Sequence, residues 1–131
     1  MLKAALWFLV ACALSVPAVL WSTRHFEDGY ARELEHSADC YGKLRALTHL
    51  GQIETTFDAL EVLKTIQFEE WSASRAAQSL ELPPAEASKL MADRLEFYTR
   101  RYITLSQHGD QREIRVQAAA IERCMHEQFI R

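Results

Sequence analysis

Residues 4–21 read AALWFLVACALSVPAVLW and contain no charged side chain. At the helical rise these 18 residues span about 27 Å, close to the thickness of the hydrocarbon core of a bilayer. Trp7 and Trp21 lie near the two ends of the run, and indole rings favour the membrane interface. The run therefore predicts a transmembrane helix at the N-terminus, with the rest of the chain attached to it.

The charges on either side of the run predict its orientation. Lys3 precedes it, whereas Arg24 is followed closely by Glu27 and Asp28. Because positive charge favours the cytoplasmic side, we expect a cytoplasmic N-terminus and an exported domain. We divide the chain into an anchor or signal segment (residues 1–23) and an exported domain (residues 24–131). In a bacterium this places the anchor in the inner membrane and the domain in the periplasm.

Two other interpretations of the N-terminus remain open. A cleaved signal peptide would have its apolar core at residues 4–14 and small residues at Val16-Pro17-Ala18, although the apolar run continues to Trp21. Leu9-Val10-Ala11-Cys12 resembles a bacterial lipobox, in which the cysteine is lipidated, but apolar residues follow it instead of a polar tether. All three interpretations export the domain.

The domain shows helical periodicity throughout. Its apolar residues recur three or four positions apart, and 4 glycines and 3 prolines leave little turn chemistry for a β fold. Pro83-Pro84, Gly109 and an Asp110/Glu113 capping box mark helix ends. The predicted helices are residues 26–50, 55–82, 84–108 and 110–129. Short connections predict an all-α fold, an N-terminal transmembrane helix followed by an antiparallel four-helix bundle. The absence of a breaker between Thr23 and Asp28 predicts one continuous rod.

Apolar spacing also predicts which side chains face the core. In the second predicted helix the inward stripe is Phe57, Leu60, Leu63, Gln67 and Trp71, with Val62, Ile66 and Phe68 widening it. The small residues 72–74 would bend or break this helix. We expect Tyr98 and Tyr102 of the third helix in the core together with Phe68 and Trp71; any of these aromatic side chains that is exposed would instead mark an interface.

Two of the three cysteines lie in the domain, Cys40 in the first helix and Cys124 in the last. Cys40 lies about 21 Å along the first helix from Phe26, and an antiparallel fourth helix puts Cys124 at about 15 Å. The difference is about one helical turn, so a bundle can bring the two together. Exported cysteines are commonly paired, which predicts a structural Cys40–Cys124 disulfide; the alternative is two buried free thiols.

The same part of the sequence contains possible metal ligands. Glu33 and His36 form one Glu-x-x-His pair, whereas di-iron bundles use two. His36 with Cys40 and Cys124 could start a zinc site, but Cys124 and His126 are two positions apart and face different directions. We therefore expect no metal, and no motif indicates a cofactor.

Charge argues against nucleic-acid binding. The chain has 15 Lys and Arg against 18 Asp and Glu and a net charge of −3, whereas nucleic-acid binders usually carry a basic face. Five arginines gather in the third and fourth predicted helices. They are Arg94, Arg100, Arg101, Arg112 and Arg115. They form either a solvated face with local ion pairs or a docking patch for an acidic partner or lipid headgroups.

No catalytic motif occurs in the sequence, so we expect a protein that is not an enzyme. The architecture suggests a single-span membrane protein that acts through protein–protein contacts, as an accessory or assembly subunit of a bacterial envelope complex. One alternative is a periplasmic ligand-binding or chaperone-like helical module. A second alternative is a phage-type lysis or exclusion protein.

Overall fold

The computed structural model describes residues 2–50 and 57–127, except for the side chains of residues 14, 16, 18, 19, 22 and 23. Four helices account for nearly all of these residues. They are α1 (Leu2–Leu50), α2 (Ala59–Ser79), α3 (Pro84–His108) and α4 (Gln111–Glu127). The described parts contain no strand, so the all-α prediction is confirmed. Residues 51–56 and 128–129, which belonged to the predicted connections and helices, lie outside the described chain.

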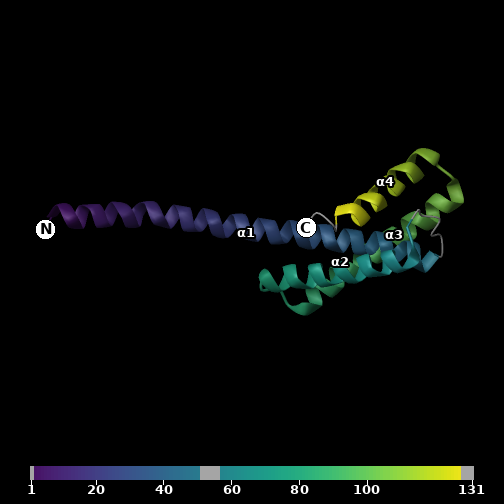
Figure 1. The fold of residues 1–131 in the computed structure, drawn as a ribbon, viewed down its shortest axis with the longest axis horizontal. Coiled ribbons are helices and arrows are strands. Elements are labelled where there is room, and N and C mark those ends of the chain that lie inside the picture. Colours follow the sequence, from purple (N-terminus) through teal and green to yellow (C-terminus); the bar gives the residue numbers. More distant parts are fainter. Residues whose placement is uncertain (1, 51–56, 128–131) are drawn as a thin grey trace.

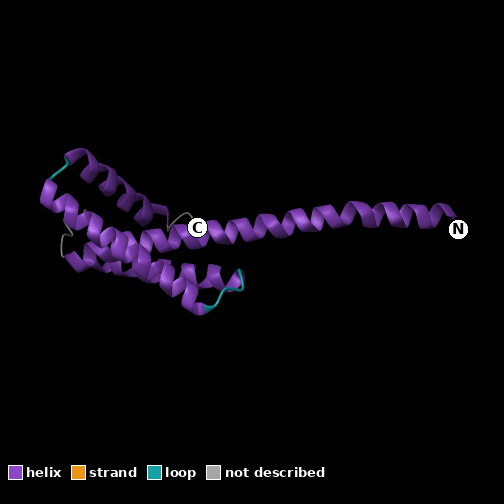
Figure 2. Cartoon of the chain, turned by 180° about the vertical axis from the view of Figure 1, so that it is seen from behind, coloured by secondary structure: helices purple, strands orange, loops and turns teal. Residues whose placement is uncertain are grey.

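The first helix has two parts with different surroundings. Its 49 residues extend over about 74 Å, unbroken at Pro17 and Gly29, and confirm the predicted rod. The N-terminal half stands clear of the other helices (Figures 1 and 2), and Leu34 is the first described side chain that is buried. Counting only the described residues, none of the four helices is both long and apolar enough to cross a membrane.

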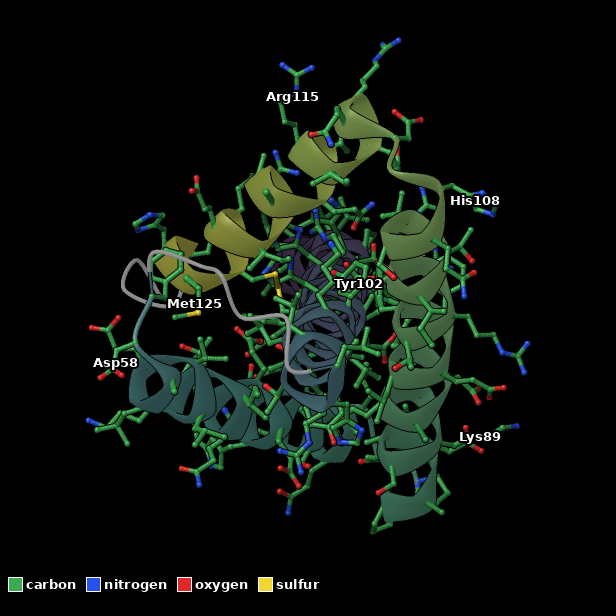
Figure 3. The ribbon with its side chains drawn as sticks, turned by 90° about the vertical axis from the view of Figure 1, so that its right-hand side faces the viewer. Asp58, Lys89, Tyr102, His108, Arg115 and Met125 are labelled. Atoms are coloured by element: carbon green, nitrogen blue, oxygen red, sulfur yellow. A yellow bond between two sulfur atoms is a disulfide. The ribbon has the colours of Figure 1, made fainter. Side chains whose placement is uncertain are left out.

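The C-terminal part of α1 is the central helix of the domain. α2, α3 and α4 each pack against it, as the view along α1 shows (Figure 3). The four helices alternate in direction, as predicted for an antiparallel bundle, and α4 crosses the others obliquely (Figure 1). The domain is therefore three helices around a fourth, because α1 supplies side chains to both parts of the core.

Two clusters of buried side chains form that core. The first lies toward the C-terminal end of α1 and joins all four helices. Its members are Cys40, Leu44, Ala46, Val62, Ile66, Tyr98, Tyr102, Ile121, Cys124 and Met125. The second lies nearer the projecting half of α1 and is built from small residues. Its members are Leu34, Ala38, Ala73, Ala76, Ala77, Ala87 and Met91. The predicted core positions Tyr98 and Tyr102 are both buried.

The predicted inward face of α2 is partly wrong: Val62 and Ile66 are buried as predicted, but three of the larger apolar residues are not. Leu60, Leu63 and Trp71 are exposed, and Trp71 keeps 55% of its surface accessible. Apart from one glutamate, the buried face instead carries small and β-branched residues. It comprises Val62, Thr65, Ile66, Glu69, Ser72, Ala73, Ala76 and Ala77. Short side chains let two helices approach closely, so this face packs on α1 although the opposite face holds larger apolar groups.

The expected bend at residues 72–74 is also absent, because α2 continues to Ser79. The Ser37 hydroxyl donates to the Ser72 hydroxyl at 3.0 Å, and Ser72 donates to a carboxylate oxygen of Glu33 at 2.9 Å. These contacts satisfy polar groups that face α1, so serine is tolerated in the middle of the helix.

Gly42 marks the closest approach of α1 and α3. A Cβ atom at this position would lie 2.8 Å from the backbone carbon and from Cβ of Arg94, and 2.9 Å from the Arg94 carbonyl oxygen. Only hydrogen fits in that space, so the glycine sets the spacing of the two helices.

The helix ends follow local rules. At the end of α2 the N–H of Leu82 bonds to the carbonyl of Ala77 and that of Glu81 to the carbonyl of Gln78, which is a Schellman motif. Glu81 takes the left-handed position there (φ 57°), so α2 ends four residues before Pro83. α3 then begins at Pro84 and ends at Gly109 (φ 66°), as predicted.

The start of α4 fits half of its predicted capping box. The Asp110 carboxylate accepts from the backbone N–H groups of Arg112 and Glu113, at 3.1 and 3.4 Å. The Glu113 side chain does not reach back to Asp110 and instead accepts from Arg101.

Candidate functional site

The disulfide is the covalent feature of the domain. Cys40 and Cys124 lie with their sulfurs 2.10 Å apart and their Cα atoms 5.6 Å apart, so the predicted pair is brought to bonding distance. Figure 3 shows the yellow sulfur bond between α4 and α1. Because the two residues are 84 positions apart, the bond joins the last helix to the central one. Cys12 is exposed and free in the N-terminal half of α1.

The histidine beside this bond has a carboxylate partner. Nε2 of His36 lies 2.8 Å from a carboxylate oxygen of Glu127 and 3.7 Å from the Cys40 sulfur. Glu33, the other half of the Glu-x-x-His pair, accepts from Ser72. In the described residues no group of three or more His, Cys, Asp or Glu is placed to hold a metal ion.

The tryptophans expected at the membrane interface lie on the projecting half of α1. Trp7 and Trp21 keep 74% and 69% of their surface exposed. Trp21 stacks on His25 with ring centroids 5.4 Å apart. The same half of α1 carries a largely apolar surface whose other described large side chains near the two tryptophans are also exposed. They are Leu6, Phe8, Leu9, Val10 and Leu20.

The five arginines of the predicted docking patch divide into two groups. Arg94 lies 2.5 Å from Glu35, Arg100 lies 2.5 Å from Glu96, and Arg101 pairs with Glu113. Arg112 and Arg115 form no ion pair with a described carboxylate. The Nε of Arg115 donates to the Gln111 carbonyl, and the side chain points away from the bundle at the start of α4 (Figure 3). Three of the five charges are thus neutralised locally.

The Arg101 contact also affects acid–base behaviour. The hydrogen bonds from Arg101 and then Gln117 lower the pKa of Glu113 below its ordinary value. The carboxylate therefore stays ionised and holds α3 against the start of α4.

A polar network joins one of the two core tyrosines, Tyr98, to α1. The Tyr98 hydroxyl donates to Asp39 at 2.5 Å, and Asp39 also pairs with Lys43 at 2.7 Å. Burial, followed by the Asp39 contacts, raises the pKa of Tyr98 well above its ordinary value. Burial does the same for Tyr102. Both phenols therefore stay neutral at physiological pH and act as core side chains.

A groove missed by the sequence analysis lies between α1, α2 and the end of α4. Its volume is about 740 Å³, and Trp71 and Phe68 form its aromatic wall with ring centroids 6.0 Å apart. Arg32 of α1 and Arg75 of α2 also line it, and the Arg75 guanidinium lies 5.3 Å from the centre of the Trp71 ring. The i, i+4 spacing of Trp71 and Arg75 could have indicated that the two side chains lie together on the helix surface. The prediction that Trp71 points into the core concealed this pair.

A second groove, of about 680 Å³, runs along α3 beside the start of α4. Phe97 is exposed in it, and its arginines are the paired Arg100 and Arg101. This groove therefore offers an apolar side chain among charges that are already neutralised.

No protein-family model matches the chain, and no curated protein or solved structure matches it with statistical significance.

Proposed function

We propose that this chain is a single-span membrane protein with a cytoplasmic N-terminus and an exported, disulfide-bonded helical domain. The domain acts through protein–protein contacts, as an accessory or assembly subunit of a bacterial envelope complex, without a catalytic step. The observation that carries the proposal is the projecting half of α1, which stands clear of the other helices (Figure 1) and whose described large apolar side chains are exposed.

The sequence of residues 4–21 supports insertion. The run is continuous and uncharged, and it includes positions whose side chains the structure does not describe. Leaving one large apolar side chain in water costs about 1.5–3 kcal/mol relative to burial, and several such residues are exposed here. A membrane removes this cost without any rearrangement of the domain.

The disulfide supports export. A cysteine pair at bonding distance forms and persists in oxidising compartments such as the periplasm, and thiols remain reduced in the cytosol. The predicted orientation of the anchor delivers Cys40 and Cys124 to such a compartment.

The continuous helix supports a role in contacts. Because α1 is both the proposed anchor and the central helix of the domain, no linker separates the two. The domain is therefore held at a set distance from the bilayer and presents its grooves at a defined height.

The test of membrane insertion uses a matched pair of variants. Ala13 lies within the apolar run, and Ala31 lies beyond it; both are exposed. An arginine near the centre of a span costs about 2.5–3.5 kcal/mol, so Ala13→Arg should reduce the fraction that resists carbonate extraction. Ala31→Arg should remain in the membrane fraction.

Two further measurements decide the remainder of the proposal. Maleimide labelling in intact cells should find Cys40 and Cys124 oxidised, and purification in mild detergent should retain a partner in fixed stoichiometry. Wild-type chain in the soluble fraction with both cysteines reduced would contradict the anchored, exported arrangement.

A further inference from the structure

We infer that the groove between α1, α2 and the end of α4 binds an acidic segment of a partner protein that also carries an apolar side chain. This proposal deepens the proposed function and rests on it for the position of the groove relative to the membrane. It names the surface of the domain that makes the contact.

The aromatic wall provides the apolar half of the site. Trp71 exposes 55% of its surface although it lies in the middle of α2, and Phe68 lies beside it. Large aromatic side chains that line an open groove contribute most of the binding energy at many protein interfaces. An apolar side chain of the partner would cover the Trp71 ring.

The arginines provide the charge. Arg32 donates from Nε to the Asp28 carbonyl at 3.3 Å, and Arg75 lies over the Trp71 ring. Neither forms an ion pair with a carboxylate of the described chain.

The carboxylates of the same groove already accept hydrogen bonds. Glu127 pairs with His36, and Glu33 accepts from Ser72. Both carboxylates stay in the groove beside the two arginines, but neither contacts a guanidinium, so Arg32 and Arg75 keep donors for a ligand, and a guanidinium fork suits a carboxylate.

The height of the groove favours a protein over lipid. Arg32 lies eleven residues beyond Trp21, or about 16 Å along α1. If Trp21 marks the edge of the hydrocarbon, the headgroups reach only about 5–8 Å above it. Arg32 therefore lies beyond the lipid phosphates, at the height of the exported part of a partner protein next to the anchor.

The test selects peptides against the full-length protein in nanodiscs of phosphatidylcholine. The probe is a phage-displayed library of random peptides about twelve residues long. Enriched peptides should carry Asp or Glu next to a large apolar residue. Enrichment without acidic residues would overturn the proposal.

Variants then locate the bound peptide. Arg32→Gln with Arg75→Gln should raise its Kd at least about tenfold, because two charge-assisted contacts are lost. Lys89→Gln with Arg123→Gln removes the same charge at exposed sites outside the groove and should change Kd less than about twofold. Equal effects of the two pairs would overturn the assignment.

Fluorescence gives a readout at the site itself. The chain has 3 tryptophans, so Trp7→Phe with Trp21→Phe leaves Trp71 as the reporter. The selected peptide should shift its emission. The detergent-purified protein could instead bind vesicles that contain anionic lipid. If the Arg32/Arg75 variant lost this vesicle binding, the groove would be assigned to lipid headgroups and the proposal would be overturned. Failure of membrane fractionation would overturn the proposed function, whereas equal effects of the two double variants on Kd would overturn the groove assignment alone.

Discussion

Replacing Gly42 by alanine tests whether the close approach of α1 and α3 holds the domain together. The added methyl would meet backbone atoms of Arg94 at 2.8 and 2.9 Å, and backbone cannot rotate away as a flexible side chain can. α3 must therefore move, which costs about 1–3 kcal/mol for an overpacked site. Alanine regains about 1 kcal/mol of helix propensity. Because the obstacle is backbone, we expect a net loss of about 1–2 kcal/mol.

Gly29→Ala is the matched control. It lies in the same helix, and a Cβ atom there meets nothing within 4 Å. The propensity gain then acts alone, and we expect unchanged stability or a gain of up to about 1 kcal/mol. The two substitutions are chemically identical, so opposite signs isolate the contact with Arg94.

Thermal unfolding of the full-length protein in detergent, followed by circular dichroism, measures the difference. One kcal/mol corresponds to about 4 °C for a domain of this size, so Gly42→Ala should lower Tm by about 4–8 °C. If Gly42→Ala unfolds at or above the wild-type temperature, the helices are not held at the spacing described here.

Replacing Cys40 and Cys124 together by alanine should destabilise the domain by about 4.6 kcal/mol on the chain-entropy model for a closed loop of 84 residues; an unchanged urea midpoint would refute it. Glu81→Gly relieves a left-handed residue in the Schellman motif and should stabilise the domain by about 0.5–1 kcal/mol, whereas a loss would show that the Glu81 side chain matters. The pKa values of Tyr98 and Tyr102 are raised on folding, so their contribution to stability is present below about pH 10 and declines as pH rises further. Tyrosinate absorbance should therefore appear for these two only as the domain unfolds in alkali, and early titration of both would contradict their burial.

Local chemistry made the helix boundaries predictable. Pro84 can occupy the first turn of a helix, Gly109 adopts the left-handed conformation that closes one, and the Asp110 carboxylate caps the exposed N–H groups of the next. Each of these effects depends on a few neighbouring residues. The end of α2 was predicted three residues too late, because Glu81 occupies a position that glycine usually takes.

The cysteine pair was predictable for a different reason. Helical rise and antiparallel order set the levels of Cys40 and Cys124 to within about one turn. How the helices are arranged around one another was not predictable in this way. Two cysteines at the same height along the bundle axis are compatible with a square bundle or with three helices around α1.

The groove depended on which face of α2 is buried. Apolar periodicity shows that a helix has a face that prefers burial. It favours the face with the largest and most hydrophobic side chains, and in α2 that is not the face that packs on α1. The structure buries Ala73, Ala76 and Ala77 and leaves Leu60 and Trp71 exposed.

Local sequence signals are enough to identify this protein as helical, to place most of its helix ends, to select the cysteines that can meet, and to find the uncharged apolar run within residues 1–23. The central position of α1, the contact of Gly42 with α3, and the groove that holds Trp71 with Arg32 and Arg75 arise only when the helices pack. Helix formation and capping depend on neighbouring residues, whereas the choice of a buried face depends on how closely the partner helix can approach.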